Sequence, residues 1–248
     1  MTVNVVILPA LIGEGELAGR EVVVFDVLRA TTTMTAALAA GAAGVWLFSS
    51  VESAKAARDK EADRPLLAGE IKAVRPEGFD LGNSPGEFVA DRVSGRRVFM
   101  ATTNGTKAIL ACAAAGAEHV WAGALVNATA VARRLARAGR PVTLVCAGTV
   151  GRVSLEDVLG AGAVMERLSE IGSVEPGNDS AVIAAELYGA MRGDLPGALR
   201  CGQGGKNIRA VHLDPDIDFA AKLDSIDLVG LARGEPWVVR REDDGMTR

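Results

Sequence analysis

The feature that most limits the fold of this chain is the alternation of short, β-branched runs with longer, alanine-rich runs of helical period. The sequence predicts strands over residues 3–8, 21–27, 45–48, 65–68, 97–101, 119–121, 142–146 and 237–240. It predicts helices over 31–40, 51–60, 84–92, 106–115, 127–138, 154–170, 179–192 and 220–224, with a turn at 202–205. Strands and helices that alternate in this way build βα units on one sheet. We therefore expect a three-layer α/β/α fold with a largely parallel or mixed central sheet.

Length and composition narrow the class of protein further. The chain has 248 residues, of which 49% are hydrophobic, which is enough for one full core. We expect a single domain over 1–240, or one with two lobes, and a disordered tail over 241–248. A net charge of −4 disfavours broad contact with nucleic acid. The absence of a signal-peptide pattern and of a long apolar run predicts a cytoplasmic protein without a membrane partner.

Three predicted strands lead through polar or glycine-containing loops directly into helices. On a parallel sheet these loops would share one edge, where helix N-termini offer N–H groups to an anion. The candidate binding residues are Thr31, Thr32, Thr102, Thr103, Asn104, Gly105, Thr106, Lys107, Gly148 and Thr149. Arg29, Lys107 and Arg152 supply positive charge for such a site. Helix capping is the alternative for any one loop, since Thr and Asn commonly cap helices.

Carboxylates at the ends of apolar runs are candidate metal ligands. Asp26 and Glu70 have this position, and Mg²⁺ prefers one or two such oxygens together with waters. Asp179 is a third candidate, or it simply begins a helix. Asp157 fits a helix-capping role in the first turn of the helix over 154–170, whereas Glu156 remains open as a catalytic residue. A further acidic group is expected to be a solvated face: Asp214, Asp216 and Asp218.

Cys146 and Arg152 raise a separate possibility. They have the C-x5-R spacing with which cysteine phosphatases hold a phosphate over a thiolate. The flanking residues Val145 and Val153 depart from that pattern, and a small buried thiol at a strand end is the alternative. The odd number of cysteines gives no disulfide framework.

Several separated motifs carry a resemblance to a known family. They are Asp26-Val27-Leu28-Arg29-Ala30-Thr31-Thr32-Thr33, Gly78-Phe79-Asp80-Leu81-Gly82-Asn83-Ser84-Pro85, Thr102-Thr103-Asn104-Gly105-Thr106, and Cys146-Ala147-Gly148 continuing to Ser154-Leu155-Glu156-Asp157. With these motifs the chain resembles the 2-phosphosulfolactate phosphatase family, most clearly over residues 20–190. The resemblance implies Mg²⁺ dependence and hydrolysis of 2-phospho-3-sulfolactate, a step of coenzyme M biosynthesis.

Residue roles follow from this resemblance together with the chemistry of each side chain. We expect Asp26, Glu70 and Asp179 at the metal, and Arg29, Asn83, Ser84 and the 102–107 loop at the anionic oxygens. Asp26 as a phosphorylated nucleophile stays open, although Leu28 stands where such enzymes usually have a second Asp. A noncatalytic protein that binds an anionic metabolite is the other alternative. The expected partners are a small phosphomonoester and, in a homodimer, a second copy of the chain.

Overall fold

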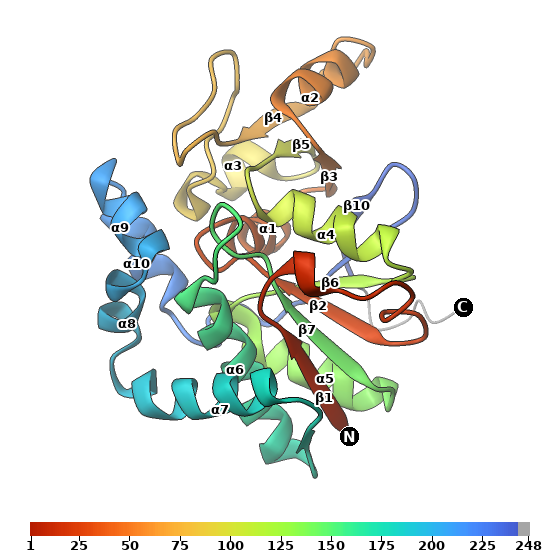
Figure 1. Cartoon of the computed structure of the whole chain (residues 1–248). Helices are drawn as coiled ribbons and strands as arrows, with labels where there is room; N and C mark the ends of the chain where they lie inside the picture. Colours follow the sequence, from red (N-terminus) through yellow and green to blue (C-terminus); the bar gives the residue numbers. More distant parts are fainter. Residues whose placement is uncertain (243–248) are drawn as a thin grey trace.

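The protein folds around a single mixed β-sheet, shown in a computed structural model that describes residues 1–242 (Figure 1). The strand order is β4-β5-β3-β10-β9-β6-β2-β7-β1-β8. The strands are β1 (Thr2–Val6), β2 (Glu21–Phe25), β3 (Gly44–Phe48), β4 (Leu66–Gly69), β5 (Arg97–Ala101), β6 (Val120–Gly123), β7 (Val142–Cys146), β8 (Glu175–Pro176), β9 (Gly230–Arg233) and β10 (Val238–Arg241). The expected mixed sheet is thus confirmed.

The sheet consists of two parallel groups that run in opposite directions. Strands β4, β5 and β3 form one group, and β6, β2, β7, β1 and β8 form the other. Between them β9 and β10 pair antiparallel with each other and with their outer neighbours β6 and β3. Three successive antiparallel pairings reverse the direction from one group to the other. Our reason for expecting the three polar loops together, a shared edge of a parallel sheet, is therefore wrong.

The helices cover both faces of the sheet. They are α1 (Ala30–Ala39), α2 (Val51–Arg58), α3 (Ala90–Val93), α4 (Gly105–Ala114), α5 (Ala128–Ala138), α6 (Leu155–Ile171), α7 (Asp179–Met191), α8 (Leu195–Cys201), α9 (Gln203–Ala210) and α10 (Asp214–Ala220). Short 3-10 turns cover Pro9–Leu11, Pro85–Glu87, Leu125–Asn127 and Arg192–Asp194.

Helices α1 and α4 lie between the two strand groups (Figure 1). One hydrophobic core joins them to strands of both groups, with Met34 and Ile109 packed among Val24, Leu47 and Met100. A flat sheet could not bring these strands to a shared core. The sheet therefore bends around α1 and α4, and the bend brings the loop after β5 to the loop after β2.

The outer faces complete the three layers. Helices α5, α6 and α7 share a second core with β2, β6 and β7, which includes Phe25, Trp121 and Leu159. Helix α2 covers the outside of β4 and β5 through a smaller core that contains Ala54 and Phe99. No helix within residues 1–242 combines the length and the hydropathy needed to cross a membrane.

The sequence predicted the elements before residue 192 well and the later ones poorly. Helices α8, α9 and α10 replace the predicted turn at 202–205 and the predicted helix at 220–224. The glycines there serve close packing, because a Cβ on Gly205 would collide with the backbone of Leu199. Short strands β8 and β9 were also not predicted, and the helix expected over 84–92 is a 3-10 turn followed by α3.

The predicted disordered tail over 241–248 is wrong at its first two residues. Arg241 belongs to β10, and Glu242 accepts a hydrogen bond from Nε of Arg134 at 2.7 Å. These two residues are therefore part of the fold. The remainder of the predicted tail, residues 243–248, lies outside the described residues.

Candidate active site

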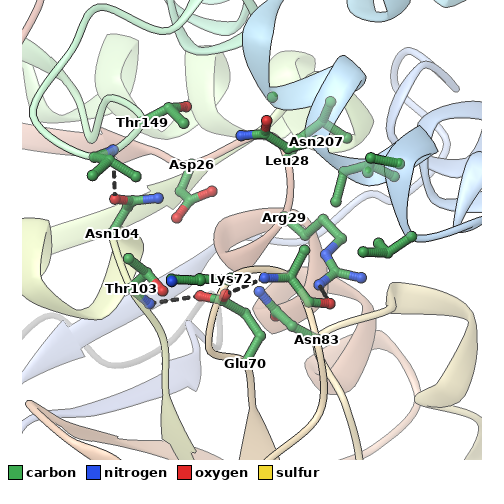
Figure 2. A pocket seen from close by; sticks show the side chains of 16 residues that line it. Asp26, Leu28, Arg29, Glu70, Lys72, Asn83, Thr103, Asn104, Thr149 and Asn207 are labelled. Carbon is green, nitrogen blue, oxygen red and sulfur yellow. Dashed lines mark hydrogen bonds between the residues drawn. The ribbon is translucent and has the colours of Figure 1, made fainter.

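A cavity of about 440 Å³ lies where the loops after β2, β4, β5 and β7 meet α9 (Figure 2). We call the side formed by these loops the motif wall; it includes Asp26, Leu28, Arg29, Glu70, Lys72, Ala73, Asn83, Thr103, Asn104, Thr149 and Val150. We call the opposite side the helical wall; it includes Gly204, Asn207, Ile208, Ala210 and Val211. All four sequence motifs contribute residues to the motif wall, so the predicted convergence is confirmed.

Asp26 is the buried carboxylate of the motif wall. Its Oδ1 accepts the N–H of Ala30 at 3.2 Å, which places the carboxylate at the N-terminus of α1. Burial and the neighbouring charges of Glu70 and Glu156 raise its pKa from 3.8 to about 7, while backbone N–H groups of Ala30 and Gly105 oppose this shift. Burial is the largest cause of this shift, and the charges of the two neighbouring carboxylates add to it.

Two glycines permit the close approach of these loops. A Cβ on Gly105 would lie 2.7 Å from Oδ2 of Asp26, so only glycine lets the start of α4 reach this carboxylate. Gly148 has a φ of +73°, and a Cβ there would lie 2.6 Å from the carbonyl oxygen of Arg152. Both positions need glycine for packing, and Gly148 also needs it for its backbone conformation.

Asp157 holds the loops after β2 and β7 together. Its carboxylate accepts the N–H of Val27 at 2.9 Å and that of Gly148 at 3.0 Å. Burial, followed by the charges of Asp26 and Glu156, raises its pKa well above 3.8. The capping prediction is only half of its role: its own N–H bonds Ser154, while its side chain bridges two strands' loops.

Glu156, unlike Asp157, is a buried carboxylate that accepts no hydrogen bond from another loop within residues 1–242. Its side chain is 1% exposed, and neither carboxylate oxygen has a hydrogen-bond partner among the described residues. Burial raises its pKa, while its own backbone N–H and the hydroxyl of Ser154 lie near enough to oppose this shift in part. It packs directly against Gly204 of the helical wall, which has no space for a side chain. A buried carboxylate without donors costs free energy unless it is protonated or meets a cation.

Glu70 links the loops after β4 and β5. One oxygen accepts the N–H of Thr103 at 2.6 Å and the other accepts that of Ala73 at 2.8 Å (Figure 2). Asn104 makes a similar link, because its Oδ1 accepts the N–H of Val150 at 3.1 Å. These bonds fix three loops of the motif wall relative to one another.

Polar groups that can bind an anion line the same cavity. Arg29 is 3% exposed, and Lys72 extends from the loop after β4. Asn83 is also buried, and its Oδ1 has no hydrogen-bond partner among the described residues. An unpaired polar atom on a cavity wall indicates a polar ligand or water at that point.

Several predicted binding residues instead support the loops. Thr31, Thr32, Thr102 and Thr106 are buried and do not line the cavity. Their hydroxyls bond nearby backbone; for example, Thr32 donates to the carbonyl of Val27 at 2.8 Å. The capping alternative does not describe them in full either, because the N-cap residues of α1 and α4, Arg29 and Asn104, make no side-chain capping bond. Gly105, Gly148 and Ser84 also lie behind the wall, because the first two pack on other loops and Ser84 contacts Arg29.

Four other predicted residues lie apart from the cavity. Lys107 and Arg152 are exposed, and neither lines it. Asp179 is exposed at the start of α7, beside edge strand β8, so the structure gives no support to its metal role. Cys146 is fully buried in the core under α6, and burial with the charges of Asp157 and Glu156 raises its thiol pKa well above 9. The thiolate alternative therefore loses its geometric basis.

Sequence reasoning missed three groups at the site. Lys72 lies two residues after Glu70, and this spacing could have indicated a cation beside the predicted metal ligand. Asn207 stands in a segment predicted as a turn. Asp216 was assigned to a solvated face, yet it is buried and accepts a hydrogen bond from Arg29 at 2.7 Å. No local pattern distinguishes it from Asp214 and Asp218.

The donor set suits a cation that keeps much of its water. Within residues 1–242, no three His, Cys, Asp or Glu side chains gather as a ready-made metal cage. Mg²⁺, however, commonly takes one or two carboxylates and fills its remaining positions with water and phosphate oxygens. The raised pKa of Asp26 and the unpartnered oxygens of Glu156 indicate surplus negative charge that such a cation would offset.

Fold and cavity together define an α/β protein with a small-molecule site at its strand ends, lined by carboxylates and cations. Comparison with known proteins adds the family. The family model described as 2-phosphosulpholactate phosphatase matches residues 6–235, and the chain belongs to this family.

Relatives support this membership along most of the chain. The chain is 42% identical over 215 residues to a probable 2-phosphosulfolactate phosphatase of Symbiobacterium thermophilum, covering 86% of this chain and 91% of the relative. A protein of the same name from Deinococcus radiodurans is 44% identical over 207 residues, covering 83% and 85%. One from Thermus thermophilus is 43% identical over 215 residues, covering 86% and 88%.

Proposed function

We propose that the protein is a Mg²⁺-dependent phosphatase that hydrolyses 2-phospho-3-sulfolactate to 3-sulfolactate and phosphate. The observation that carries this proposal is the meeting of all four family motifs on one cavity, through Asp26, Asn83, Asn104 and Thr149. The relatives named above are described as probable phosphatases of this substrate. A cavity with both carboxylates and cations suits a substrate that carries phosphate, carboxylate and sulfonate.

Asp26 is the residue best suited to hold the metal ion. It faces the cavity, it is buried, and neighbouring carboxylates disfavour its charge in the absence of a cation. Glu70 would be the second ligand, since each oxygen accepts one N–H and keeps a further lone pair. When bound, Mg²⁺ would screen the negative charge of the phosphoryl oxygens.

The remaining residues bind and orient the substrate. Arg29 and Lys72 attract its anionic groups, and the amides of Asn83, Asn104 and Asn207 offer hydrogen bonds around the same space. Hydrolysis breaks the bond between phosphorus and the oxygen of the 2-hydroxy acid, and the elements of water are added. Attack by water and attack by Asp26 both fit this arrangement. The configuration at phosphorus of an isotopically chiral phosphate ester distinguishes them, because one displacement by water inverts it and two displacements through Asp26 retain it.

Phosphate release from synthetic 2-phospho-3-sulfolactate tests the proposal directly. The full-length protein should release phosphate with Mg²⁺ and lose this activity when a chelator removes the ion. Activity that survives chelation would contradict the metal dependence. Binding of the compound without phosphate release under any divalent metal would instead support a noncatalytic binding protein.

We also propose a cytoplasmic location, a homodimer, and a place in coenzyme M biosynthesis. Free thiols support the cytoplasmic location, because Cys112, Cys146 and Cys201 form no disulfide in this structure. Light scattering of the purified protein tests the dimer. Measurement of the 3-sulfolactate pool in cells that lack the protein tests the pathway.

A further inference from the structure

The buried ion pair between Arg29 and Asp216 joins the motif wall of the cavity to helix α10, which packs against α9. Nη1 of Arg29 lies 2.7 Å from Oδ2 of Asp216, and the pair joins the loop after β2 to α10. Both side chains are almost fully buried, at 2% and 7% exposure. Ser84 strengthens the pair, because its hydroxyl donates to the same Oδ2 at 2.8 Å and accepts from Nη1 at 3.1 Å.

These contacts use only part of the guanidinium of Arg29. Its Nη1 donates to Asp216 and Ser84, and its Nη2 donates to the carbonyl oxygen of Ala73 at 2.8 Å. Of the five N–H groups of an arginine, Nε–H and one at Nη2 then have no hydrogen-bond partner within residues 1–242. Arg29 lines the cavity, and donors on neighbouring nitrogens of one guanidinium bind two oxygens of a carboxylate, phosphate or sulfonate well.

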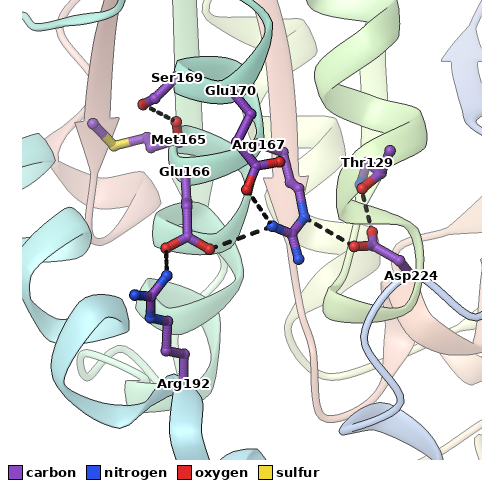
Figure 3. A network of polar contacts seen from close by, with 8 residues as sticks. All are labelled: Thr129, Met165, Glu166, Arg167, Ser169, Glu170, Arg192 and Asp224. Atoms are coloured by element: carbon purple, nitrogen blue, oxygen red, sulfur yellow. Dashed lines mark hydrogen bonds and ion pairs between the residues drawn. The ribbon is translucent and has the colours of Figure 1, made fainter.

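Helix α10 is held in place by contacts far from the cavity. The chain leaves α7 at Arg192 and returns at Asp224, and both residues pair with α6 (Figure 3). Arg192 contacts Glu166, while Nε of Arg167 lies 2.9 Å from Asp224. Asp224 also accepts the N–H of Thr129 at 2.6 Å. The segment that carries α8, α9 and α10 is therefore fixed at both ends to the rigid core.

We propose that Asp216 is a positioning residue for substrate binding. From this fixed helix it holds Nη1 of Arg29, so that the unpaired Nε–H and Nη2–H remain turned to the cavity and bind an oxyanion of the substrate. Without the carboxylate, the buried guanidinium would lose its charge partner and turn away from this orientation. The inference rests on the proposed function, in which Arg29 meets an anionic group.

Replacement of Asp216 by Asn tests this role because it keeps the size of the side chain and removes the charge. The full-length variant should show a KM for 2-phospho-3-sulfolactate raised about tenfold or more, with kcat within about threefold of the wild type. Asp216→Glu should recover part of the loss. Asp218→Asn is the matched control, because Asp218 lies on the same helix, is exposed, and pairs with Arg200. This control should leave both constants unchanged.

A KM within twofold of the wild type in folded Asp216→Asn would overturn the proposal, as would a fall in kcat alone. If this variant does not fold, as judged by circular dichroism, Ser84→Ala decides. A KM raised threefold or more supports the proposal, and an unchanged KM contradicts it. Calorimetric binding of 3-sulfolactate tests the positioning role of Asp216 separately from the proposed phosphatase function. Weaker binding by the variants supports the positioning role even if the wild type releases no phosphate, whereas binding equal to that of the wild type contradicts the positioning role.

Discussion

The motif wall and the helical wall of the cavity are built in different ways. Several residues of the motif wall directly follow strands in the sequence, as Asp26 does after β2 and Glu70 after β4, and longer bonds then join their loops. The helical wall lies on short helices late in the chain, and the neighbouring helix α10 meets Arg29 through Asp216, 187 positions away. The motif wall therefore leaves a readable sequence pattern, whereas the helical wall does not. We expect the motif wall to govern catalysis as well as binding, and the helical wall to affect binding alone.

Asp26→Asn should produce the largest loss of activity and so test the catalytic role of the motif wall. Loss of the carboxylate should lower kcat by roughly a thousandfold or more, since Glu70 would be left as the only proposed ligand of the metal ion. Asn can still accept the N–H of Ala30, and removal of a charge relieves repulsion with Glu70 and Glu156. The melting temperature should therefore stay equal or rise. Full activity in this variant would refute the role of the motif wall.

Asp157→Ala should mainly affect stability. The change leaves the buried N–H groups of Val27 and Gly148 without their acceptor, so the free energy of unfolding should fall by about 3 kcal/mol. Urea denaturation measures the loss. Asp227→Ala provides the control, because the exposed pair with Arg133 should contribute less than about 1 kcal/mol. Equal stability of the two variants would mean that the bridge between the loops is unimportant.

The raised pKa of Asp26 predicts a pH dependence of stability in the presence of a chelator. Because the folded state holds this proton more tightly than the unfolded state, stability should fall as pH rises from about 4 to about 7. The fall should amount to a few kcal/mol. Urea denaturation at pH 5 and at pH 7.5 measures the difference. An identical pH dependence in the wild type and in Asp26→Asn would exclude Asp26 as its source.

Asn207→Ala should have a smaller effect, confined to binding. The side chain lies on the helical wall and is exposed, so its loss should raise KM by roughly threefold to tenfold with kcat unchanged. Lys206→Ala, on the same helix but away from the cavity, should behave as the wild type. A fall in kcat for Asn207→Ala would break the proposed division between the two walls.

Cys146→Ala should have the smallest effect. The thiol is buried in the core and does not line the cavity, so turnover should stay within about twofold of the wild type. A thiol reagent should modify Cys201, which is exposed, and leave Cys146 and Cys112 intact in the native protein. Loss of turnover in a folded Cys146→Ala protein would restore the thiolate route.

The sequence predicted the layers and the motif wall because both depend on local patterns. Strand and helix periodicity located the elements up to α7, and the residues that follow each strand identified Asp26, Glu70 and Asn104. The reversal of strand direction within the sheet was not predictable in this way, because it arises from β9 and β10, which enter the sheet from the far end of the chain. The burial of Asp216 depends on the same kind of long-range contact.

Local patterns also misjudged which polar residues face the cavity. Thr31, Thr102 and Thr106 follow strands just as Asn104 does, yet their hydroxyls bond the nearby backbone. Lys72 lines the cavity from the loop after β4, whereas Lys107 lies in the first turn of α4 and does not line it. Side-chain direction in a loop depends on tertiary packing, so the sequence gives the set of candidates and the structure selects among them.

A crystal structure of the protein with Mg²⁺ and a nonhydrolysable phosphonate analogue of 2-phospho-3-sulfolactate tests the central claim most directly. We expect the ion at Asp26 and an anionic group of the analogue at the unpaired N–H groups of Arg29, between the two walls. An analogue and ion bound elsewhere on the protein, with this cavity holding only water, would contradict the assignment of the active site.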